Sequence, residues 1–186
     1  MARVPYVESE DVPEQHRDLL VSSLQDRPLH VYRALGNNPA VLAGLRGFLS
    51  SLWSDSGLTD RRRELVILAV TREIGNEYEF HQHVNIARDV GIDDETIAAV
   101  SGGKFDEFDG EEAALLRYAV AVVRGEVDDR EHEAIAEHYD ESAVVGIAAL
   151  AEGYAGLGGI IDALGVELEG EFVGWKPGEG GGEDGE

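Results

Sequence analysis

The sequence predicts an all-α fold with roughly six to eight helices in one domain. Apolar residues recur at the 3.6-residue spacing of an α-helix in most segments of the chain, and no segment shows sustained strict alternation bounded by hairpin turns. The 186 residues are 43% hydrophobic, which is enough to build a sizeable core. The helical elements can be placed in order from their start and stop signals.

The N-terminal part is expected to be a peripheral segment, residues 1–27, in which "DVPEQHRDLL" forms a short helix starting near Pro13. The main helical domain is expected to span residues 28–170. Its first helix starts near Pro28 and stops at "GNN", and its second starts at Pro39, because proline is favoured in the first turn of a helix.

In the middle of the chain, Thr59 can cap the helix "DRRRELVILAVTREIG", which is charged in its first turn and then almost wholly apolar. Such a helix is expected to be buried on most sides. The next helix covers Tyr78 to Val90 and ends at Gly91, a usual glycine stop, after which Asp93 caps a short helix.

Three helices are expected to complete the domain, in "DGEEAALLRYAVAVVRGE", in "DDREHEAIAEHYD" and in the apolar stretch from Ser142 to Val166. The apolar stretch is long enough for a membrane span, but Glu152 and Asp162 inside it would be costly in lipid, so a buried core helix is predicted. Residues 171–186, rich in glycine and acid, are expected to form a disordered tail.

The charge excludes two classes of partner. The chain has 15 Lys and Arg against 38 Asp and Glu, a net charge of −23, which repels phosphate backbones and anionic lipid headgroups. Neither nucleic acid nor a membrane is therefore an expected partner. The acidic, lysine-poor surface suits a halophilic cytosol rich in potassium chloride, the alternative being an ordinary acidic protein. With no secretory signal at the N-terminus, a cytoplasmic location is expected.

The chain contains no cysteine. Disulfides, thiolate metal ligands and any thiol redox cycle carried by this chain alone are therefore excluded. Any chemistry must use other side chains.

The stretch "GNEYEFHQHVNIARDVGI" holds two glutamates and two histidines. On a helix each residue advances about 100°, so Glu79 and Phe80 lie within roughly 60° of His83 on the apolar face. His81 falls about 160° away and is expected to face solvent, so the two histidines could not grip one metal ion. A strand would place them together, but the helical spacing speaks against it, and no metal site is expected.

Each of these residues has a structural interpretation beside a functional one. His83 could be a core histidine held by one hydrogen bond, with Glu79 as its i,i+4 partner, and Glu64 could complement a helix dipole next to three arginines. If a carboxylate and an imidazole meet in a partly apolar pocket, however, they shift each other's pKa and can relay a proton. The residues alone leave open whether they meet.

The segment from Leu58 to Val100 resembles the carboxymuconolactone decarboxylase family, the superfamily that includes the alkylhydroperoxidase D proteins. In the thiol peroxidase branch the motif reads Cys-x-x-Cys-x-x-x-His-x-x-x-Ala, with a glutamate about one helix upstream. Matching His83 to that histidine puts the two cysteine positions at Asn76 and Glu79 and the glutamate at Glu64. Because both thiols are missing, thiol peroxidase activity is not expected.

The sequence looks like the cysteine-free decarboxylase branch. This resemblance implies an alkylhydroperoxidase D-like helical bundle that assembles into homotrimers or homohexamers. It also implies a cofactor-free lyase that acts on a small organic acid or lactone: His83 would be the general acid or base, Glu64 would orient it or relay its proton, and Glu79 would tune it. Tyr78 and Phe80 are expected to bind the substrate. The alternative is a non-catalytic oligomeric binding or structural protein that retains the fold.

Small residues in the last apolar stretch would permit close helix approach in such an assembly, although packing within one chain explains them equally well. They are Gly146, Ala148, Ala149, Gly153, Gly156 and Gly159.

Overall fold

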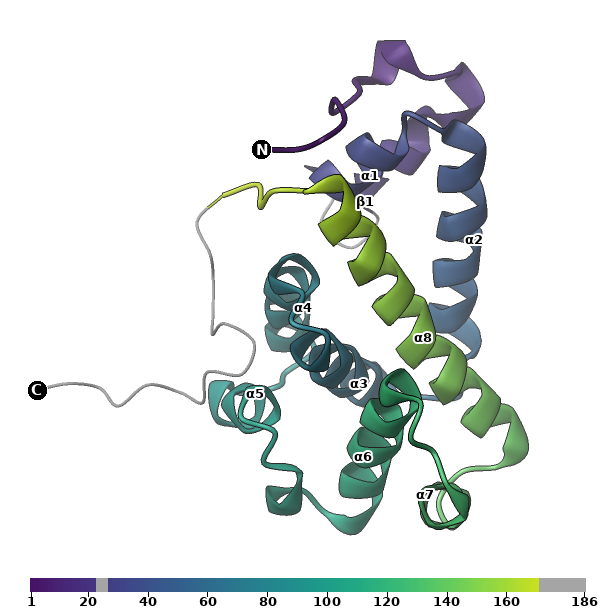
Figure 1. Ribbon diagram of the computed structural model, residues 1–186, viewed down its shortest axis with the longest axis vertical. Helices are drawn as coiled ribbons and strands as arrows, with labels where there is room; N and C mark the ends of the chain where they lie inside the picture. Colours follow the sequence, from purple (N-terminus) through teal and green to yellow (C-terminus); the bar gives the residue numbers. More distant parts are fainter. Residues whose placement is uncertain (23–26, 171–186) are drawn as a thin grey trace, which may run out of the picture.

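The computed structural model describes residues 1–22 and 27–170, which form an all-α domain with one minor strand pair (Figure 1). In chain order the elements are η1 (Ser9–Asp11), η2 (Glu14–Leu20), β1 (Val21–Ser22), β2 (Arg27–Pro28), α1 (His30–Leu35), α2 (Pro39–Asp55), α3 (Asp60–Glu73), α4 (Glu77–Asp89), α5 (Asp94–Ser101), η3 (Phe105–Glu107), α6 (Gly110–Arg124), α7 (Asp129–Ala136) and α8 (Glu141–Leu164). The predicted fold class is confirmed. The tail predicted over residues 171–186 lies outside the described residues.

Helices α2 to α8 each begin at a residue whose side chain accepts a hydrogen bond from the first turn, which satisfies a backbone N–H that has no partner inside the helix. The predicted caps Thr59 and Asp93 are among them. The helix expected near Pro28 starts only at His30, because Arg27 and Pro28 pair with Val21 and Ser22 as β1 and β2.

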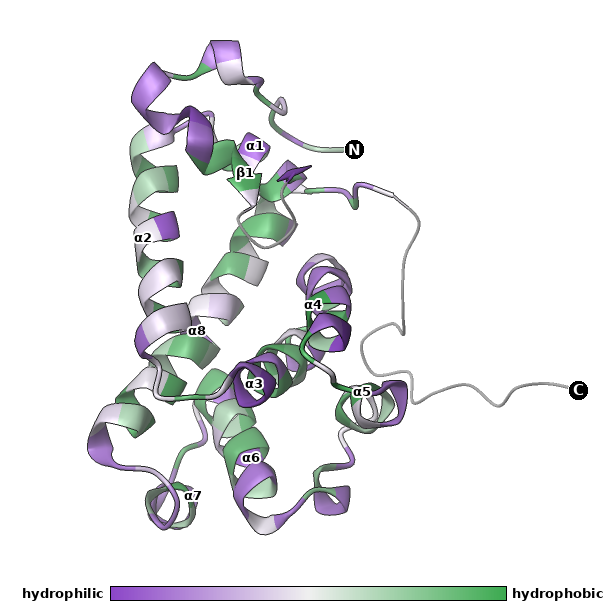
Figure 2. Ribbon diagram, turned by 180° about the vertical axis from the view of Figure 1, so that it is seen from behind, coloured by the Kyte–Doolittle hydropathy of each residue, from purple (hydrophilic) through white to green (hydrophobic). Residues whose placement is uncertain are grey.

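Helix α3 lies at the centre of the domain and packs against α4, α5, α6 and α8. Its residues from Arg63 to Thr71 are all buried, as the apolar pattern predicted. In Figure 2 the hydrophobic colour is concentrated where α3, α6 and α8 meet, while η1 and η2 are largely hydrophilic. The site described below forms on this rigid central helix and its neighbour α4.

Two apolar clusters flank α3. The first joins residues of α1, α2, α6, α7 and α8 to one side of α3, and the second joins residues of α4, α5 and α6 to the opposite side of α3. The N-terminal segment, expected to be peripheral, buries Val12 and Leu20 in the first cluster. These two apolar residues sit at the ends of short 3-10 turns and not on one helical stripe, so periodicity could not reveal their burial.

Helix α8 is long and apolar enough to cross a membrane by length and composition, but it packs against α2, α3 and α6 in the folded domain. The glycines of α8 differ in how closely other residues approach them. An added Cβ at Gly146 would lie 2.5 Å from the carbonyl oxygen of Ser56, whereas Gly156 and Gly159 face space that no described atom occupies within 4 Å. Close packing within the chain therefore explains Gly146 and does not explain Gly156 or Gly159.

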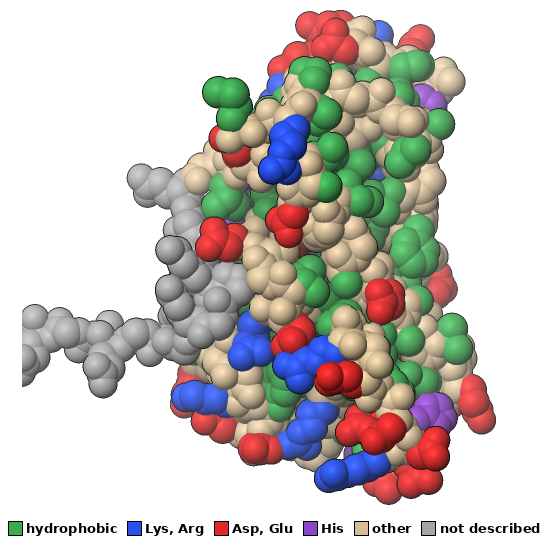
Figure 3. All heavy atoms as spheres, in the orientation of Figure 1, with side chains coloured by type: hydrophobic (Ala, Val, Ile, Leu, Met, Phe, Trp, Pro, Cys, Tyr) green, Lys and Arg blue, Asp and Glu red, His purple; other side chains and the backbone are tan. Residues whose placement is uncertain are grey.

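The surface carries the acidic excess. In Figure 3, Asp and Glu side chains crowd the upper and lower ends of the visible face, and Lys and Arg gather mainly in its lower half. Several arginines are paired with acids from another helix, among them Arg62 with Glu111 at 2.6 Å and Arg124 with Glu73 at 2.7 Å. Such exposed pairs contribute little to stability, but they connect α3 to α6.

Candidate functional site

The start of α4 is fixed by Asn76, one of the two positions at which a thiol relative would carry cysteine. Its side-chain oxygen accepts a hydrogen bond from the backbone N–H of Glu79 at 2.9 Å. Its amide nitrogen donates to the carbonyl of Gly158 at 3.1 Å and to Asp162 Oδ1 at 2.9 Å, both on α8. Asn76 therefore ties the first turn of α4 to α8.

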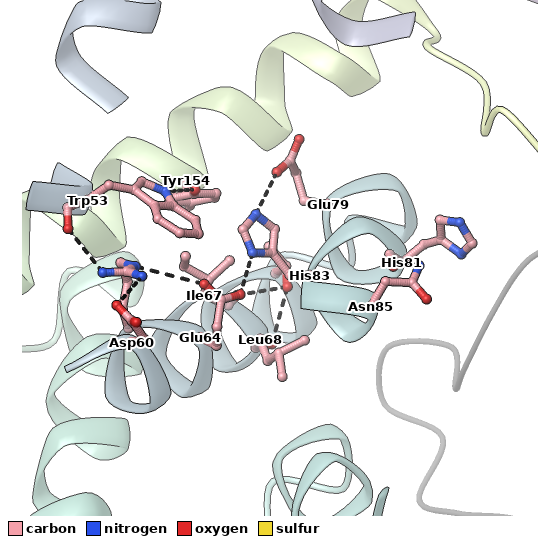
Figure 4. Close-up of polar contacts among 12 residues, drawn as sticks. Trp53, Asp60, Glu64, Ile67, Leu68, Glu79, His81, His83, Asn85 and Tyr154 are labelled. Atoms are coloured by element: carbon pink, nitrogen blue, oxygen red, sulfur yellow. Dashed lines mark hydrogen bonds and ion pairs between the residues drawn. The ribbon is translucent and has the colours of Figure 1, made fainter. Parts of the chain in front are cut away.

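The structure brings Glu64 and His83 together. His83 Nδ1 lies 2.7 Å from Glu64 Oε2, and the two residues are 4% and 0% exposed (Figure 4). An ionised carboxylate can only accept hydrogen bonds, so we assign Nδ1 as the donor to Glu64, which leaves Nε2 for other partners. The contact joins α3 to α4 and orients the imidazole.

Glu79 stands on the other side of the imidazole ring. Its Oε2 lies 3.6 Å from His83 Nε2, one helical turn away on α4, and the residue is 4% exposed. Figure 4 shows the ring of His83 between the carboxylates of Glu64 and Glu79. The predicted trio is therefore one buried cluster, in which Nε2 faces Glu79.

The pKa values of the cluster follow from burial and mutual attraction. Burial lowers the pKa of His83, but attraction to Glu64, the hydrogen bond to Glu64 and attraction to Glu79 together outweigh it, so the pKa is raised. Burial raises the pKa of Glu79 to about 7, with His83 opposing and Glu169 reinforcing the rise. Glu79 can therefore exchange a proton near neutral pH, and His83 holds its proton more tightly than a free imidazole does.

The side chain of Arg63 lies close to Glu64. Its guanidinium lies 3.9 Å from the centre of the Trp53 ring and donates to the Trp53 carbonyl at 3.0 Å and to Asp60 Oδ1 at 2.8 Å. Its Nε lies 3.9 Å from Glu64 Oε1, and neither of these buried atoms has a hydrogen-bond partner among the described residues. Positive charge thus stands next to Glu64 without binding it closely.

A cavity of about 190 Å³ opens beside the cluster. Polar side chains from α1, α2, α4 and α8 line it together with apolar residues. Among them are Tyr32, Tyr78, Glu79, Gln82, His83 and Tyr154. The cavity is smaller than the sites that hold drug-sized ligands, so it suits a small molecule.

Tyr154 of α8 meets His83 edge-on, with ring centroids 5.0 Å apart and an interplanar angle of 86°. Its hydroxyl accepts a hydrogen bond from Trp53 Nε1 at 2.9 Å, and no described residue accepts the hydroxyl proton. Burial raises the pKa of Tyr154 well above its usual value, reinforced by Glu79 and Glu64. The hydroxyl is therefore neutral, and it can donate a hydrogen bond to a ligand.

Two sequence predictions need correction. Phe80, expected to bind substrate, is 0% exposed, belongs to the second apolar cluster and is not among the residues that line the cavity. His81, expected to face solvent, is 5% exposed, although it does point away from His83 (Figure 4). Both errors have one cause, because α4 is buried on most of its circumference. An angle around the axis gives direction but does not say what lies there.

Sequence reasoning also missed several residues of the site. Arg63 was seen only as part of a charged first turn, and Trp53 and Tyr154 lie on helices far away in the chain. Gln82 could have been found, since it follows Tyr78 at i,i+4 spacing and so shares its face.

Within residues 1–22 and 27–170, no three His, Asp or Glu side chains are arranged to hold a metal ion.

Several proteins of known structure share this fold at low sequence identity. An alkylhydroperoxidase AhpD core, an uncharacterised peroxidase-related protein from Ralstonia eutropha JMP134, superposes with a TM-score of 0.82 at 21% identity, covering 92% of this chain and 94% of that one. A peroxidase-related protein from Silicibacter sp. TM1040 gives 0.81 at 14% identity, covering 92% and 93%. The debrominase Bmp8, in complex with 2,3,4-tribromopyrrole, gives 0.76 at 18% identity, covering 89% and 91%.

The sequence is also similar to a known family over part of its length. No curated protein matches it. Residues 39–125, which run from α2 to the end of α6 and include Glu64, Glu79 and His83, match the model of the carboxymuconolactone decarboxylase family. Over this segment, which is just under half of its 186 residues, the chain is similar to the carboxymuconolactone decarboxylase family; it contains no cysteine and has the alkylhydroperoxidase D-like all-α fold.

Proposed function

We propose that this protein is a cofactor-free, lyase-like enzyme that performs Glu and His acid–base chemistry on a small organic acid or lactone. The observation that carries the proposal is the buried arrangement of His83 between Glu64 and Glu79 at the wall of a small cavity. Buried ionisable groups with shifted pKa values beside a cavity are the usual mark of a catalytic site.

The roles follow from the geometry of the imidazole. Glu64 accepts the hydrogen bond from Nδ1 and so holds the ring with Nε2 toward Glu79. Because the pKa of Glu79 is about 7, Glu79 can take or give a proton near neutral pH, and because the pKa of His83 is raised, the imidazolium can supply a proton to a bound substrate. His83 is thus the proposed general acid or base, Glu64 its orienting partner and Glu79 the group that tunes it.

The proposed reaction of a β-keto acid is a decarboxylation. The bond between the α-carbon and the carboxylate breaks, carbon dioxide leaves, and the electron pair moves onto the keto group as an enolate. With a keto acid, the Tyr154 hydroxyl would donate a hydrogen bond to the enolate oxygen, since no described residue takes that proton. His83 or Glu79 would then deliver the proton to carbon.

Two features support this substrate class over others. Thiol-based peroxide reduction needs cysteines that the chain lacks. The cavity volume of about 190 Å³ favours a small molecule, and a debrominase of the same fold is solved with the small ring compound 2,3,4-tribromopyrrole. A compact acid or lactone fits these limits.

We further propose a cytoplasmic homotrimer or homohexamer with no nucleic acid or membrane partner. The net charge of −23 supports the last point. The outward-facing positions Gly156 and Gly159, together with the exposed side chains of Val145 and Ile160 on the same helix, support close contact between subunits.

The test is turnover of a panel of lactones, β-keto acids and unsaturated acids by the wild type and by Glu64→Gln and His83→Gln variants. On any substrate that the wild type converts, we expect each variant to lose roughly 10²–10⁴-fold in kcat/KM. His81→Gln is the matched control, because His81 is on the same helix and points away from the site. If the wild type converts no compound, or the variants match it, the protein is instead the non-catalytic oligomer.

A further inference from the structure

The segment that follows α8 places a carboxylate on the residues of the site. Glu169 Oε1 accepts hydrogen bonds from the Tyr78 hydroxyl and from the backbone N–H of His30, both at 2.5 Å. Its Oε2 accepts from Gln82 Nε2 at 2.7 Å. Three donors from two separate parts of the chain thus converge on the two oxygens of one carboxylate.

Two of these donors belong to the cavity. Tyr78 and Gln82 are 4% and 3% exposed, and both line the cavity that contains Glu79 and His83. Glu169 itself is only partly buried and is not among the lining residues. The donors are therefore fixed parts of the cavity wall, while the carboxylate comes from the end of the described chain.

The cavity residues of α4 form two neighbouring stripes along the helix. Tyr78 and Gln82 are separated by one turn, as are Glu79 and His83, and the second pair is displaced by about 100° around the axis. One stripe presents hydrogen-bond donors to a carboxylate, and the neighbouring stripe presents the acid–base pair. A ligand that reaches both needs its carboxylate only a few bonds from the atom that exchanges a proton.

We propose that Tyr78, Gln82 and the backbone N–H of His30 form a carboxylate-binding subsite, which Glu169 fills within the chain and which takes the carboxylate of a small organic acid when Glu169 leaves. The subsite would give the enzyme a short carboxylic acid as its substrate class, a consequence that rests on the proposed function. Binding of a carboxylate at the subsite does not depend on turnover.

Hydrogen bonding favours a carboxylate as the ligand that replaces Glu169. When Glu169 leaves, the buried Tyr78 hydroxyl loses its acceptor, and a buried polar group without a partner costs free energy. A second carboxylate restores both charged acceptor oxygens, whereas a neutral carbonyl offers one uncharged oxygen and a cation offers no acceptor. The negative charge of Glu169 also helps to raise the pKa of Glu79, so an incoming carboxylate preserves the protonation of the acid–base pair.

The experiment measures binding of acetate and propionate to the full chain, with chloride replaced at constant ionic strength. Neither probe contains a bond that acid–base chemistry would break. Glu169→Ala empties the subsite, and Glu167→Ala is the matched control, because Glu167 lies in the same segment but pairs with the N-terminal amino group and the N–H of Ala2. The side-chain amide signal of Gln82, identified by its absence in Gln82→Met, reports where the probe binds.

We expect Glu169→Ala to bind acetate at least about tenfold more tightly than the wild type and Glu167→Ala, because in those two proteins the tethered carboxylate of Glu169 occupies the subsite and competes with acetate. The Gln82 amide signal should move on titration. Equal affinity in the two alanine variants, or binding that leaves the Gln82 signal in place, would overturn the proposal. If Glu169→Ala does not fold, Glu169→Gln, which keeps the shape and loses the charge, is held to the same criterion.

The outcome is separable from the test of the proposed function. Tight acetate binding by Glu169→Ala with no turnover of any compound would support the subsite and refute the enzyme. Turnover that depends on His83, together with unchanged acetate affinity in Glu169→Ala, would do the reverse.

Discussion

The two sides of α3 differ in what they bury. On one side, the cluster around Leu65, Leu68 and Phe80 is wholly apolar, and none of its members lines the cavity. On the other side, toward α2 and α8, the apolar core gives way to Glu64, His83 and the cavity. The same pair of helices, α3 and α4, builds both sides.

The contrast shows where the fold accepts a cost. Buried carboxylates and imidazoles lose hydration, and mutual pairing only partly restores that loss. The buried ionisable residues Glu64, Glu79 and His83 lie on the cavity side, whereas the side chains that fill the second cluster are apolar. We therefore interpret the cavity side as the part shaped by function and the opposite side as the part that stabilises it.

The largest expected effect comes from breaking the apolar side. Phe80→Ala should lower the free energy of unfolding by about 3–5 kcal/mol, because the ring is fully buried and its removal leaves a cavity. Denaturant unfolding measures this, with Phe48→Ala as control, since Phe48 is 44% exposed. A Phe80→Ala cost no greater than that of Phe48→Ala would contradict the role given to this side.

A smaller effect with the opposite sign is expected on the cavity side. The raised pKa of Glu79, about 7, means that the folded protein holds this proton more tightly than the unfolded chain does. Its contribution to stability is present below the unfolded pKa of roughly 4.3 and is lost as pH rises through about 7. Glu79→Gln removes that loss and should be more stable than the wild type at pH 8 by on the order of 1–3 kcal/mol.

Urea unfolding at pH 5 and pH 8 checks this sign. The two proteins should be closer in stability at pH 5 than at pH 8. The exposed neighbour Glu77 provides the control, since Glu77→Gln removes a carboxylate from the same helical turn outside the buried cluster. A Glu79→Gln protein that is less stable than the wild type at pH 8 would show that Glu79 stabilises the fold as an anion.

The smallest effect on stability is expected for Tyr154→Phe. It removes one hydrogen bond, from Trp53 Nε1, and should cost about 1 kcal/mol. On a keto acid substrate, kcat should fall by roughly 10²-fold while stability changes little, because the hydroxyl would act only on the developing charge. A fall in stability without a fall in kcat would make Tyr154 a structural residue.

The sequence predicted the helices better than it predicted their contacts. Periodicity and caps located α2 to α8 because these signals are local, as at Thr59 and Asp93. The contact between Glu64 and His83 was suggested only by family resemblance, and the 2.7 Å distance between them confirms that they meet. Phe80 was misplaced because an angle on one helix does not identify the neighbouring helix.

Glu169 shows the limit most clearly. It meets Gln82 across 87 positions of the chain, from a segment without periodicity, and no local pattern marks it. Contacts of this kind depend on the complete packing of the domain. They can be found only once α4 and the segment after α8 are placed together.

The hydrogen bonds of Asn76 determine whether cysteines could be introduced at the two positions where thiol relatives carry them. At Glu79, a cysteine would replace a side chain of the cavity wall. At Asn76, a cysteine would remove the cap of α4 and both links to α8, and loss of a cap alone costs about 1 kcal/mol. Restoring both cysteines would therefore require other residues to replace the contacts that Asn76 makes between α4 and α8. The obstacle to a cysteine at position 76 is the stability of the fold and not the chemistry of the site.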